Sequence, residues 1–364
     1  MLLSSEQEAL DFPRGEVVLG FCRTCGFISN TAFDPSKVNY SSVYEDQQSF
    51  SSTFNAFSSN LAKGLVDKYQ LHNKNILEIG CGKGDFLSSL CELGPNSGVG
   101  IDPAHVKGRV SSAASARLTF IRDYYSECYK DYHGDLVCCR HTLEHIPNVA
   151  EFVSIVRQSI GERLETVVFF EIPDVTRVLR EQAFWDIYYE HCSYFSLGSL
   201  ARLFRHCKFE VADLRKDFDD QYLLIEAKPV IDFSTTIHRL EENVEEAAKD
   251  VGYFISQYSN KIEQWRDRLK QYYSEGKRVV VWGSGSKCVA FLTTLGIREE
   301  IDYLVDINPF RHGKFIPGAG KEIKPPAFMK QAKPDLTIVM NPIYFNEIRE
   351  MMRDMSISTE MLAV

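Results

Sequence analysis

The sequence predicts an α/β fold in which two units, each built on a mainly parallel sheet, follow one another along the chain. Two observations carry this prediction. From about residue 75 to 228, short apolar runs rich in β-branched residues alternate with helical patterns, as in βαβ units. A glycine-rich turn then follows one strand-like run in each half, in "ILEIGCGKGDF" and again in "VVVWGSGSK".

The strands of the first unit can be assigned in order. Continuous apolar runs suit a parallel sheet that is covered on both faces. These runs are "NILEIG", "GVGID", "LTFI", "DLVCCR" and "TVVFFEI". Two further runs, "FEVADLR" and "QYLLIEAKP", follow closely and are expected to pair antiparallel at the end of the unit.

A long charged stretch after these strands ends at Gly276. Its apolar residues recur at three- and four-residue spacing, which predicts one or two helices that bridge two domains. Three more strand signals follow, in "RVVVWGSGSK", "IDYLVDINP" and "DLTIVMNP". We expect a loop-rich N-terminal module over 1–60, an α/β domain over 61–229, a helical linker over 230–276 and a smaller Rossmann-like domain over 277–364.

The composition limits the partners. The chain has 364 residues, a net charge of −9 and a hydrophobic fraction of 44%, which is typical of a globular protein without a broad nucleic-acid surface. A run of about 18 apolar residues is missing, and the charged start "MLLSSEQEALDFPRG" does not resemble a signal peptide. Ten scattered cysteines fit buried thiols in a reducing compartment. We therefore expect a cytoplasmic protein with a small-molecule substrate and neither nucleic-acid nor membrane partners.

The first glycine turn carries the strongest motif. Glu78 ends a strand, and Gly80, Gly82 and Gly84 then lead into a helix. Glycines allow a sharp turn and a close approach of a ligand to the backbone. A dinucleotide fingerprint would need G-x-G-x-x-G, whereas the spacing here is G-x-G-x-G. The acid before it favours a ligand with an ammonium group over a pyrophosphate.

These features resemble the class I S-adenosylmethionine (SAM) methyltransferases, which have a Rossmann-like sheet. The resemblance implies that Asp102 accepts the ribose hydroxyls and that Asp123, in "FIRDYY", contacts the adenine amine. It also implies that the loop "CCRHTLEHIPN" approaches the cofactor and the substrate. The expected cofactor-binding residues are Glu78, Gly80, Gly82, Gly84, Asp102, Asp123, Tyr124 and His141. The alternative is a structural turn beside unrelated acids.

Cys22 and Cys25 form a C-x-x-C pair in "GFCRTCGF". Structural zinc normally takes four nitrogen or sulfur ligands, and a second pair is not found nearby. The two thiols therefore form only half a site. A turn without zinc is the favoured interpretation, and zinc shared with another chain is the alternative.

A narrower resemblance covers most of the chain, to the three-part nucleotide-sugar C-methyltransferases. It rests on "CRTCGF", "ILEIGCGKGDF", "YYEHCSYFS", "VVWGSGSK" and "DINPFRHGKFIPG". That family has an N-terminal zinc module, a SAM domain and a C-terminal Rossmann-like domain. The resemblance implies catalytic roles for five residues, His191, Glu190, Tyr188, His145 and Tyr44, with Tyr40 as the alternative to Tyr44. The first zinc-ligand pair of the family is missing here.

The chemistry of that family explains these residue types. A C–H next to a ketone is a weak acid, so a base must remove its proton before the carbon can take a methyl group. Histidine suits this task because its ordinary pKa lies near physiological pH. Which of Glu190 and His191 takes the proton stays open, and a phenol such as Tyr188 can donate to the enolate oxygen. The alternative is an aromatic core segment whose histidine is satisfied by backbone groups.

The substrate side is less specific. Arg140 could bind a phosphate or carboxylate, or could neutralise a neighbouring acid. Ser284 and Lys287 lie in the second glycine turn, where the resemblance implies contact with a nucleotide diphosphate; a packing domain is the alternative.

We expect a SAM-dependent C-methyltransferase acting on a nucleotide-linked keto sugar. The alternatives are a keto acid or carrier-bound substrate in secondary metabolism, an NAD(P)-dependent sugar oxidoreductase, and a non-catalytic SAM-binding scaffold.

Overall fold

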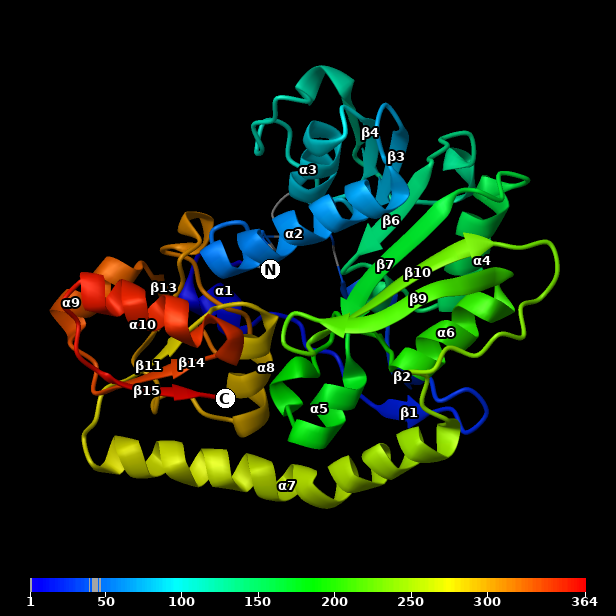
Figure 1. Ribbon diagram of the computed structural model, residues 1–364. Helices are drawn as coiled ribbons and strands as arrows, with labels where there is room; N and C mark the ends of the chain where they lie inside the picture. Colours follow the sequence, from blue (N-terminus) through cyan, green and yellow to red (C-terminus); the bar gives the residue numbers. More distant parts are fainter. Residues whose placement is uncertain (1, 39, 41–44, 46) are drawn as a thin grey trace.

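The computed structural model describes residues 2–38, 40, 45 and 47–364, and its described strands form three sheets (Figure 1). The N-terminal segment contributes α1 (Glu6–Leu10), β1 (Leu19–Phe21) and β2 (Ile28–Asn30). No helix in the described residues is long and apolar enough to cross a membrane.

The first α/β unit is built on a seven-stranded sheet of order β5-β4-β3-β6-β7-β10-β9. The strands are β3 (Asn75–Ile79), β4 (Ser97–Ile101), β5 (Leu118–Ile121), β6 (Leu136–Arg140), β7 (Val167–Pro173), β9 (Phe209–Asp217) and β10 (Tyr222–Pro229). Strands β3 to β7 are parallel, and β10 pairs antiparallel with both β7 and β9. The predicted class I methyltransferase sheet and its antiparallel end are therefore confirmed.

Both faces of this sheet are covered by helices. The helices are α2 (Ser52–Tyr69), α3 (Asp85–Leu93), α4 (Val149–Ile160), α5 (Val175–Glu181) and α6 (Leu197–His206). In β6, Leu136 and Cys138 pack with α2 and α3, whereas Val137 and Cys139 pack with α4 and α6. Side chains of a strand alternate between the faces of a sheet, so every position of β6 is buried, as its uninterrupted apolar run predicts.

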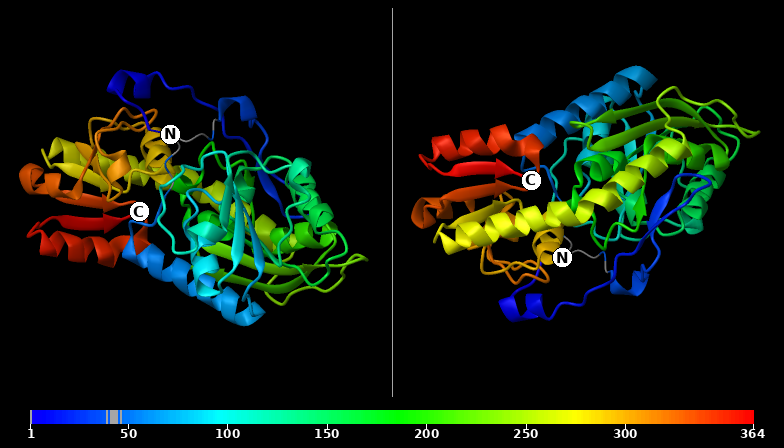
Figure 2. Two further views of the ribbon diagram at one scale, coloured as in Figure 1. Left: turned by 90° about the horizontal axis from the view of Figure 1, so that it is seen from above. Right: turned by 90° about the horizontal axis from the view of Figure 1, so that it is seen from below.

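One helix, α7 (Val244–Ser274), follows the first unit. Asn243 begins it as one half of a capping box with Glu246. At 1.5 Å per residue its 31 residues span about 46 Å, and it runs along both units (Figures 1 and 2). Ile262, Trp265 and Leu269 are buried in the core of the second unit. The predicted helical stretch is thus a single helix.

The second unit holds a five-stranded parallel sheet of order β13-β12-β11-β14-β15. Its elements are β11 (Val279–Trp282), α8 (Ser286–Leu295), β12 (Tyr303–Val305), β13 (Ile323–Lys324), α9 (Met329–Ala332), β14 (Leu336–Val339), α10 (Phe345–Asp354) and β15 (Glu360–Ala363). The sequence predicted β11, β12 and β14 but not the two edge strands. The domain boundaries stay a prediction, although α2 crosses the one placed at residue 60.

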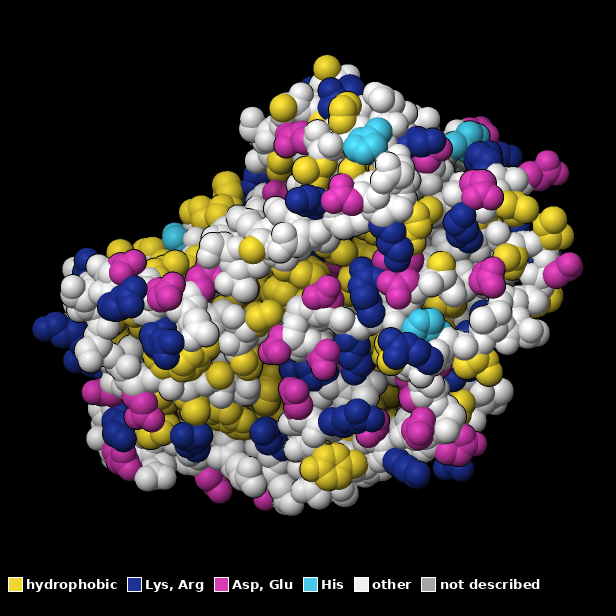
Figure 3. Space-filling model, viewed as in Figure 1, with side chains coloured by type: hydrophobic (Ala, Val, Ile, Leu, Met, Phe, Trp, Pro, Cys, Tyr) yellow, Lys and Arg dark blue, Asp and Glu magenta, His cyan; other side chains and the backbone are white. Residues whose placement is uncertain are grey.

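The start of α2 joins the two units. Glu347 of α10 accepts hydrogen bonds from Ser51 Oγ at 2.7 Å, from the Ser52 N–H at 2.9 Å and from the Thr53 N–H at 3.2 Å. A carboxylate at a helix N-terminus satisfies free N–H groups and interacts favourably with the helix dipole. Hydrophobic side chains gather below α2 (Figure 3). Phe57 of α2 contacts Phe218 of the first unit, and Phe218 contacts Tyr344 of the second. This contact holds the second unit beside the first.

The third sheet, of order β1-β2-β8, is antiparallel and small. Its last strand, β8 (Ser193–Tyr194), comes from the segment "YYEHCSYFS", and Ile28 of β2 pairs with Tyr194. Leu3 forms a β-bridge with Phe315 of the second unit. The segment from α1 to β2 therefore crosses from the second unit to the first (Figure 2) and supports the strand that follows His191.

Candidate active site

The first glycine turn, between β3 and α3, is tightly enclosed. Gly80, Gly82 and Gly84 all have positive φ, a backbone conformation that is unfavourable for residues with a side chain. A Cβ on Gly80 would lie 1.8 Å from Thr142 Oγ1. The backbone here therefore depends on glycine and leaves room for a ligand to approach it closely.

Glu78, at the end of β3, faces this turn. Its side chain is 2% exposed, and its Oε2 has no hydrogen-bond partner among the described residues. Burial raises the pKa of Glu78 to about 8 and outweighs the opposite effect of the nearby Arg140. A buried carboxyl with a free oxygen is expected to have a partner in the working protein. The ammonium group of SAM provides such a partner, so these residues fit the cofactor.

The two predicted acids after β4 and β5 differ in position. Asp102 Oδ2 accepts the N–H of Gly82 at 2.8 Å and Oδ1 accepts the N–H of Ala104 at 2.6 Å. Asp102 thus lines the cleft beside the glycine turn. Asp123 is exposed and accepts from the Tyr129 hydroxyl and the Tyr124 N–H, which lower its pKa. Tyr124 lines the cleft, so Asp123 would reach the adenine only from its edge.

Arg140, the last residue of β6, and His141, the residue after it, contact the same acid. Arg140 donates two hydrogen bonds of 3.0 Å to the buried carboxylate of Glu171, and His141 Nε2 lies 2.7 Å from Glu171 Oε1. Burial opposes ionisation of Glu171, but Arg140 and His141 outweigh it and lower the pKa to about 2. For His141, burial alone would lower the pKa, but Glu171 and Glu144 raise it to about 9. Arg140 thus neutralises a neighbouring acid, and its role toward the substrate stays a prediction.

His191 lies in the wall of the cleft, with 7% exposure. The Tyr188 hydroxyl lies 2.9 Å from its Nε2. Burial lowers the pKa of His191 well below its ordinary value, and the positive charges of His145, His141 and Lys287 act in the same direction. His191 is therefore a neutral imidazole at physiological pH and can accept a proton.

His145 belongs to the short helix η4 (Leu143–His145) and packs edge-on against His191, with ring centroids 4.9 Å apart. Its Nδ1 lies 2.8 Å from the carbonyl oxygen of Glu190 and 2.7 Å from the Tyr40 hydroxyl. The half-buried Glu190 also lines the cleft. Tyr44 lies outside the described residues, whereas Tyr40 is the tyrosine seen beside His145.

The second glycine turn forms the opposite wall. Ser284 donates from its N–H at 2.9 Å and from its hydroxyl at 2.6 Å to Asp306 at the end of β12. Lys287, in the first turn of α8, pairs with Asp186 at 2.7 Å. Asp186 also accepts from Arg177 at 2.5 Å. Ser284 and Lys287 line the same cleft as His191, but each already has a partner in the chain.

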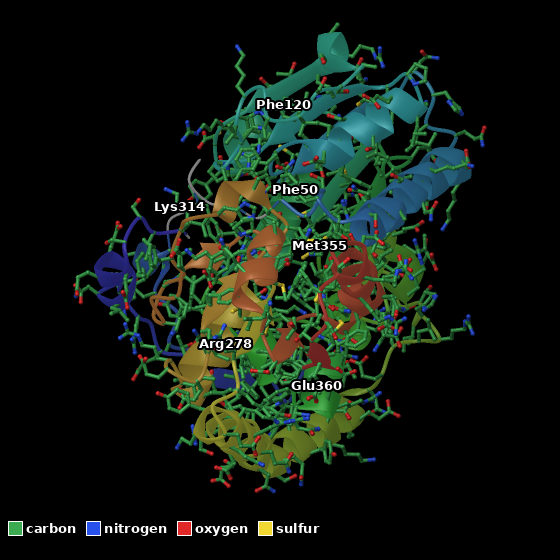
Figure 4. The ribbon with its side chains drawn as sticks, turned by 90° about the vertical axis from the view of Figure 1, so that its left-hand side faces the viewer. Phe50, Phe120, Arg278, Lys314, Met355 and Glu360 are labelled. Atoms are coloured by element: carbon green, nitrogen blue, oxygen red, sulfur yellow. The ribbon has the colours of Figure 1, made fainter. Side chains whose placement is uncertain are left out.

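Sequence reasoning missed a group of residues that close the cleft between the units. Glu45 pairs with Arg109 of the first unit and accepts a hydrogen bond of 2.9 Å from Asn308 of the second. Arg311 donates to the Glu45 carbonyl oxygen at 2.6 Å. Phe50 lies between the two units in Figure 4 and lines the cleft. No local pattern marks these residues, because their partners are distant in the sequence.

Cys22 and Cys25 sit in a tight turn between β1 and β2. The Gly26 N–H donates to the Cys22 carbonyl oxygen at 2.9 Å. N–H groups of Thr24 and Cys25 lower the pKa of the Cys22 thiol. Among the described residues, only Glu144, His145 and His191 form a group of three with the ligand types and spacing for a metal ion. The pair thus remains half a site in this chain.

These walls enclose one cleft of about 580 Å³, into which both glycine turns, the segment from Tyr188 to His191, and His145 all open. Ligands of open α/β sheets bind outside the carboxyl ends of the strands. The cleft has this position in both units. The predicted cofactor and acid–base residues that the structure describes therefore line one space, apart from Gly84 and Asp123.

Comparisons with known proteins agree with this geometry. A family model described as a methyltransferase domain matches residues 49–214, and one described as a C-methyltransferase C-terminal domain matches residues 230–361. C-methyltransferase NovU of Streptomyces niveus is 26% identical over 287 residues, which cover 75% of this chain and 67% of that protein.

Solved structures are less similar. Magnesium protoporphyrin IX methyltransferase from Synechocystis PCC 6803, with S-adenosylhomocysteine (SAH) bound, is 14% identical over 52% of this chain and 91% of its own, with a TM-score of 0.40. An O-methyltransferase family protein from Burkholderia thailandensis is 15% identical over 48% of this chain and 58% of its own, with a TM-score of 0.38. Scores of this size carry no argument about this chain.

The sheet, the enclosed glycine turn and the matched methyltransferase domain define a SAM-dependent methyltransferase. Both matched domains and the NovU relative narrow the class further. The chain is therefore a SAM-dependent C-methyltransferase, similar to NovU. This outcome favours the methyltransferase over the oxidoreductase and the non-catalytic scaffold.

Proposed function

We propose that the chain methylates a carbon next to a ketone, and that the substrate is a nucleotide-linked keto sugar. The observation that carries the proposal is the neutral, buried His191 in a cleft that the glycine turn of the first unit also lines. Bound SAM supplies the methyl group at this place. The residues of the chain must then remove a proton and hold the resulting negative charge.

His191 is the proposed base. Its neutral Nε2 takes the proton as the C–H bond breaks, and the electron pair stays on the carbon. Tyr188, whose hydroxyl lies beside Nε2, donates to the developing enolate oxygen. His145, held by the Glu190 carbonyl oxygen, packs against His191 on the same side. Glu190 accepts a hydroxyl of the sugar or serves as the alternative base.

The second unit supports the choice of a nucleotide-linked substrate. Its glycine turn precedes α8 without a side-chain cap, so the first N–H groups of this helix face the cleft and suit a phosphate. A free keto acid has no diphosphate to bind these N–H groups. For this reason we rank a keto acid second among the candidate substrates.

A substrate screen tests the proposal. The protein is incubated with SAM and a panel of keto-sugar nucleotides and keto acids, and mass spectrometry measures the gain of one methyl group. We expect a product from the keto-sugar nucleotides. His191→Ala is expected to lower kcat/KM by about 1000-fold and Glu190→Gln by less, because acid–base groups typically contribute that much. The matched control, His72→Ala, changes an exposed histidine and should keep wild-type activity. Wild-type turnover in both cleft variants would refute the proposed base.

The pH dependence gives a second test of the same base. His191 must be neutral to act, so kcat/KM rises as the pH rises through its pKa. Since burial and neighbouring positive charges lower this pKa, the rise should lie below pH 6.5, the ordinary value for histidine. An acidic limb at or above neutral pH would contradict His191 as the base.

A further inference from the structure

Glu144 is a buried carboxylate in the cleft that the mechanism above does not use. It lies in η4 between Leu143 and His145, and its side chain is 3% exposed. Its Oε2 has no hydrogen-bond partner among the described residues. Burial of a charged group is costly unless opposite charges offset it. The surroundings of Glu144 supply such charges.

Glu144 is one member of a line of alternating charges that leads to His191. Arg140 pairs with Glu171, and Glu171 pairs with His141. His141 Nδ1 lies 3.7 Å from Glu144 Oε1, and this same oxygen lies 4.0 Å from His191 Nε2. The line begins at a permanently charged guanidinium in β6 and ends at the proposed base. Glu144 is the last anion before that base.

We propose that Glu144 is a positioning residue that stabilises the protonated form of His191 while the substrate loses its proton. This inference rests on the proposed function. When the C–H bond breaks, its electron pair stays on the carbon and the proton forms an N–H bond on His191, whose ring then carries a positive charge. The Glu144 carboxylate offsets that charge, and the proton later leaves to water.

The other groups around His191 explain why such a carboxylate is needed. Tyr188 and Tyr194 contact His191 from its own segment, where Glu190 lines the same cleft. Glu144 and His145 lie beside it from η4, and the charges of His141 and Lys287 act on it from the loop after β6 and from α8. His145, His141 and Lys287 oppose a positive charge on the ring. Asp186 neutralises Lys287 rather than His191. Glu144 therefore acts on the step at which His191 becomes cationic.

A metal ion is the competing interpretation of the same residues. Glu144, His145 and His191 offer ligand atoms within 4.8 Å of one another. However, the charged His141 lies beside the same Glu144 oxygen and would repel a cation bound there. This neighbour favours a proton site over a cation site.

Kinetics of Glu144→Gln test the proposal, with a keto-sugar nucleotide that the screen shows to be methylated. We expect kcat to fall about 100-fold with KM changed less than about twofold, because the effect concerns the charge formed during reaction. The acidic limb of the pH profile should move to lower pH, since loss of the neighbouring carboxylate makes His191 harder to protonate. Glu144→Asp should restore part of kcat. Glu165→Gln, which changes an exposed glutamate, is the matched control.

Histidine NMR of the SAH-bound protein adds a test that needs no substrate. The His191 ring should titrate at lower pH in Glu144→Gln than in the wild type. If the screen finds no methylation but this shift occurs, the proposed substrate fails while the link between Glu144 and His191 stands. An unchanged pH profile and His191 titration in a folded Glu144→Gln would overturn the proposal. Loss of activity on EDTA treatment with recovery on adding Zn²⁺ would also overturn it, in favour of the metal site.

Discussion

The two α/β units contain the same strand–turn–helix motif, but the two motifs leave different polar groups available to a ligand. In each, a strand ends in a glycine turn and a helix follows. An acid at the end of the next strand accepts one N–H group of the turn and one from the residue two positions after the acid itself. Asp102 accepts from Gly82 and Ala104, and Asp306 accepts from Ser284 and Asn308. The first turn belongs to the matched methyltransferase domain, and the second to the C-methyltransferase C-terminal domain.

The difference lies in which polar groups are left for a ligand. The first turn is backed by Glu78, whose Oε2 has no described partner. In the second turn, the Ser284 hydroxyl donates to Asp306 and Lys287 pairs with Asp186, so these side chains are satisfied within the chain and only the uncapped N–H groups at the start of α8 remain for a ligand. Similar strand–turn–helix patterns therefore do not imply similar affinity. The free oxygen of Glu78 distinguishes the first turn, where the cofactor is predicted to bind, from the second.

Alanine in place of one glycine of each turn should separate the two turns most strongly. In Gly80→Ala the new Cβ meets Thr142 Oγ1 at 1.8 Å with φ at +71°, so SAH binding should weaken by at least about 100-fold, or about 2.7 kcal/mol. In Gly285→Ala the nearest contact is Arg311 Nη1 at 3.8 Å, an ordinary distance, and SAH binding should stay close to wild type. Calorimetric titration with SAH measures both. Equal losses would show that the second turn also shapes the cofactor site.

Removing the charge of Asp102 or of Asp306 should give a smaller difference in SAH affinity between the two turns. Asp102 is predicted to accept the ribose hydroxyls, so Asp102→Asn should lower SAH affinity about 30-fold, since such charge-assisted bonds contribute about 2 kcal/mol. Asp306→Asn should leave SAH affinity unchanged but lower the free energy of unfolding by about 1–2 kcal/mol, because Asp306 holds its own turn together. Titration calorimetry and urea unfolding measure the two effects. A large loss of SAH affinity in Asp306→Asn would contradict the assignment of the cofactor to the first turn.

The sequence predicts the parts of both units that depend on local pattern. The strands with continuous apolar runs, such as Leu136–Arg140, are recognisable because both faces of each are buried. The edge strands Ile323–Lys324 and Glu360–Ala363 are not, because the first has two residues and the second is short and partly exposed. The glycine turns are likewise found from residue spacing alone.

The site is predictable only where one segment supplies its chemistry. Glu190 and His191 are adjacent, and Gly80, Gly82 and Gly84 lie within five positions. In contrast, Glu45 meets Asn308 across 263 positions, and Glu144 meets His191 only because β8 returns to the first unit beside η4. Such contacts depend on how the units pack. Neither the closure of the cleft nor the charge line to His191 could be inferred from the sequence.

The smallest expected effect concerns the free carboxyl that distinguishes the two turns. Glu78 has a pKa of about 8 because it is buried, so in the ligand-free protein it is mostly protonated at pH 7. Pairing with the ammonium group of SAH requires the ionised form, so binding releases a proton and strengthens as the pH rises. SAH affinity should be about fivefold higher at pH 8 than at pH 7. Titrations in buffers of different ionisation enthalpy measure the released proton.

Glu78→Gln is the control for this pH dependence. It keeps the size of the side chain but cannot ionise, so SAH should bind it more weakly, release no proton and show little pH dependence over this range. If the variant retains the wild-type pH dependence, another group titrates on binding. The free oxygen of Glu78 would then not be what separates the first glycine turn from the second.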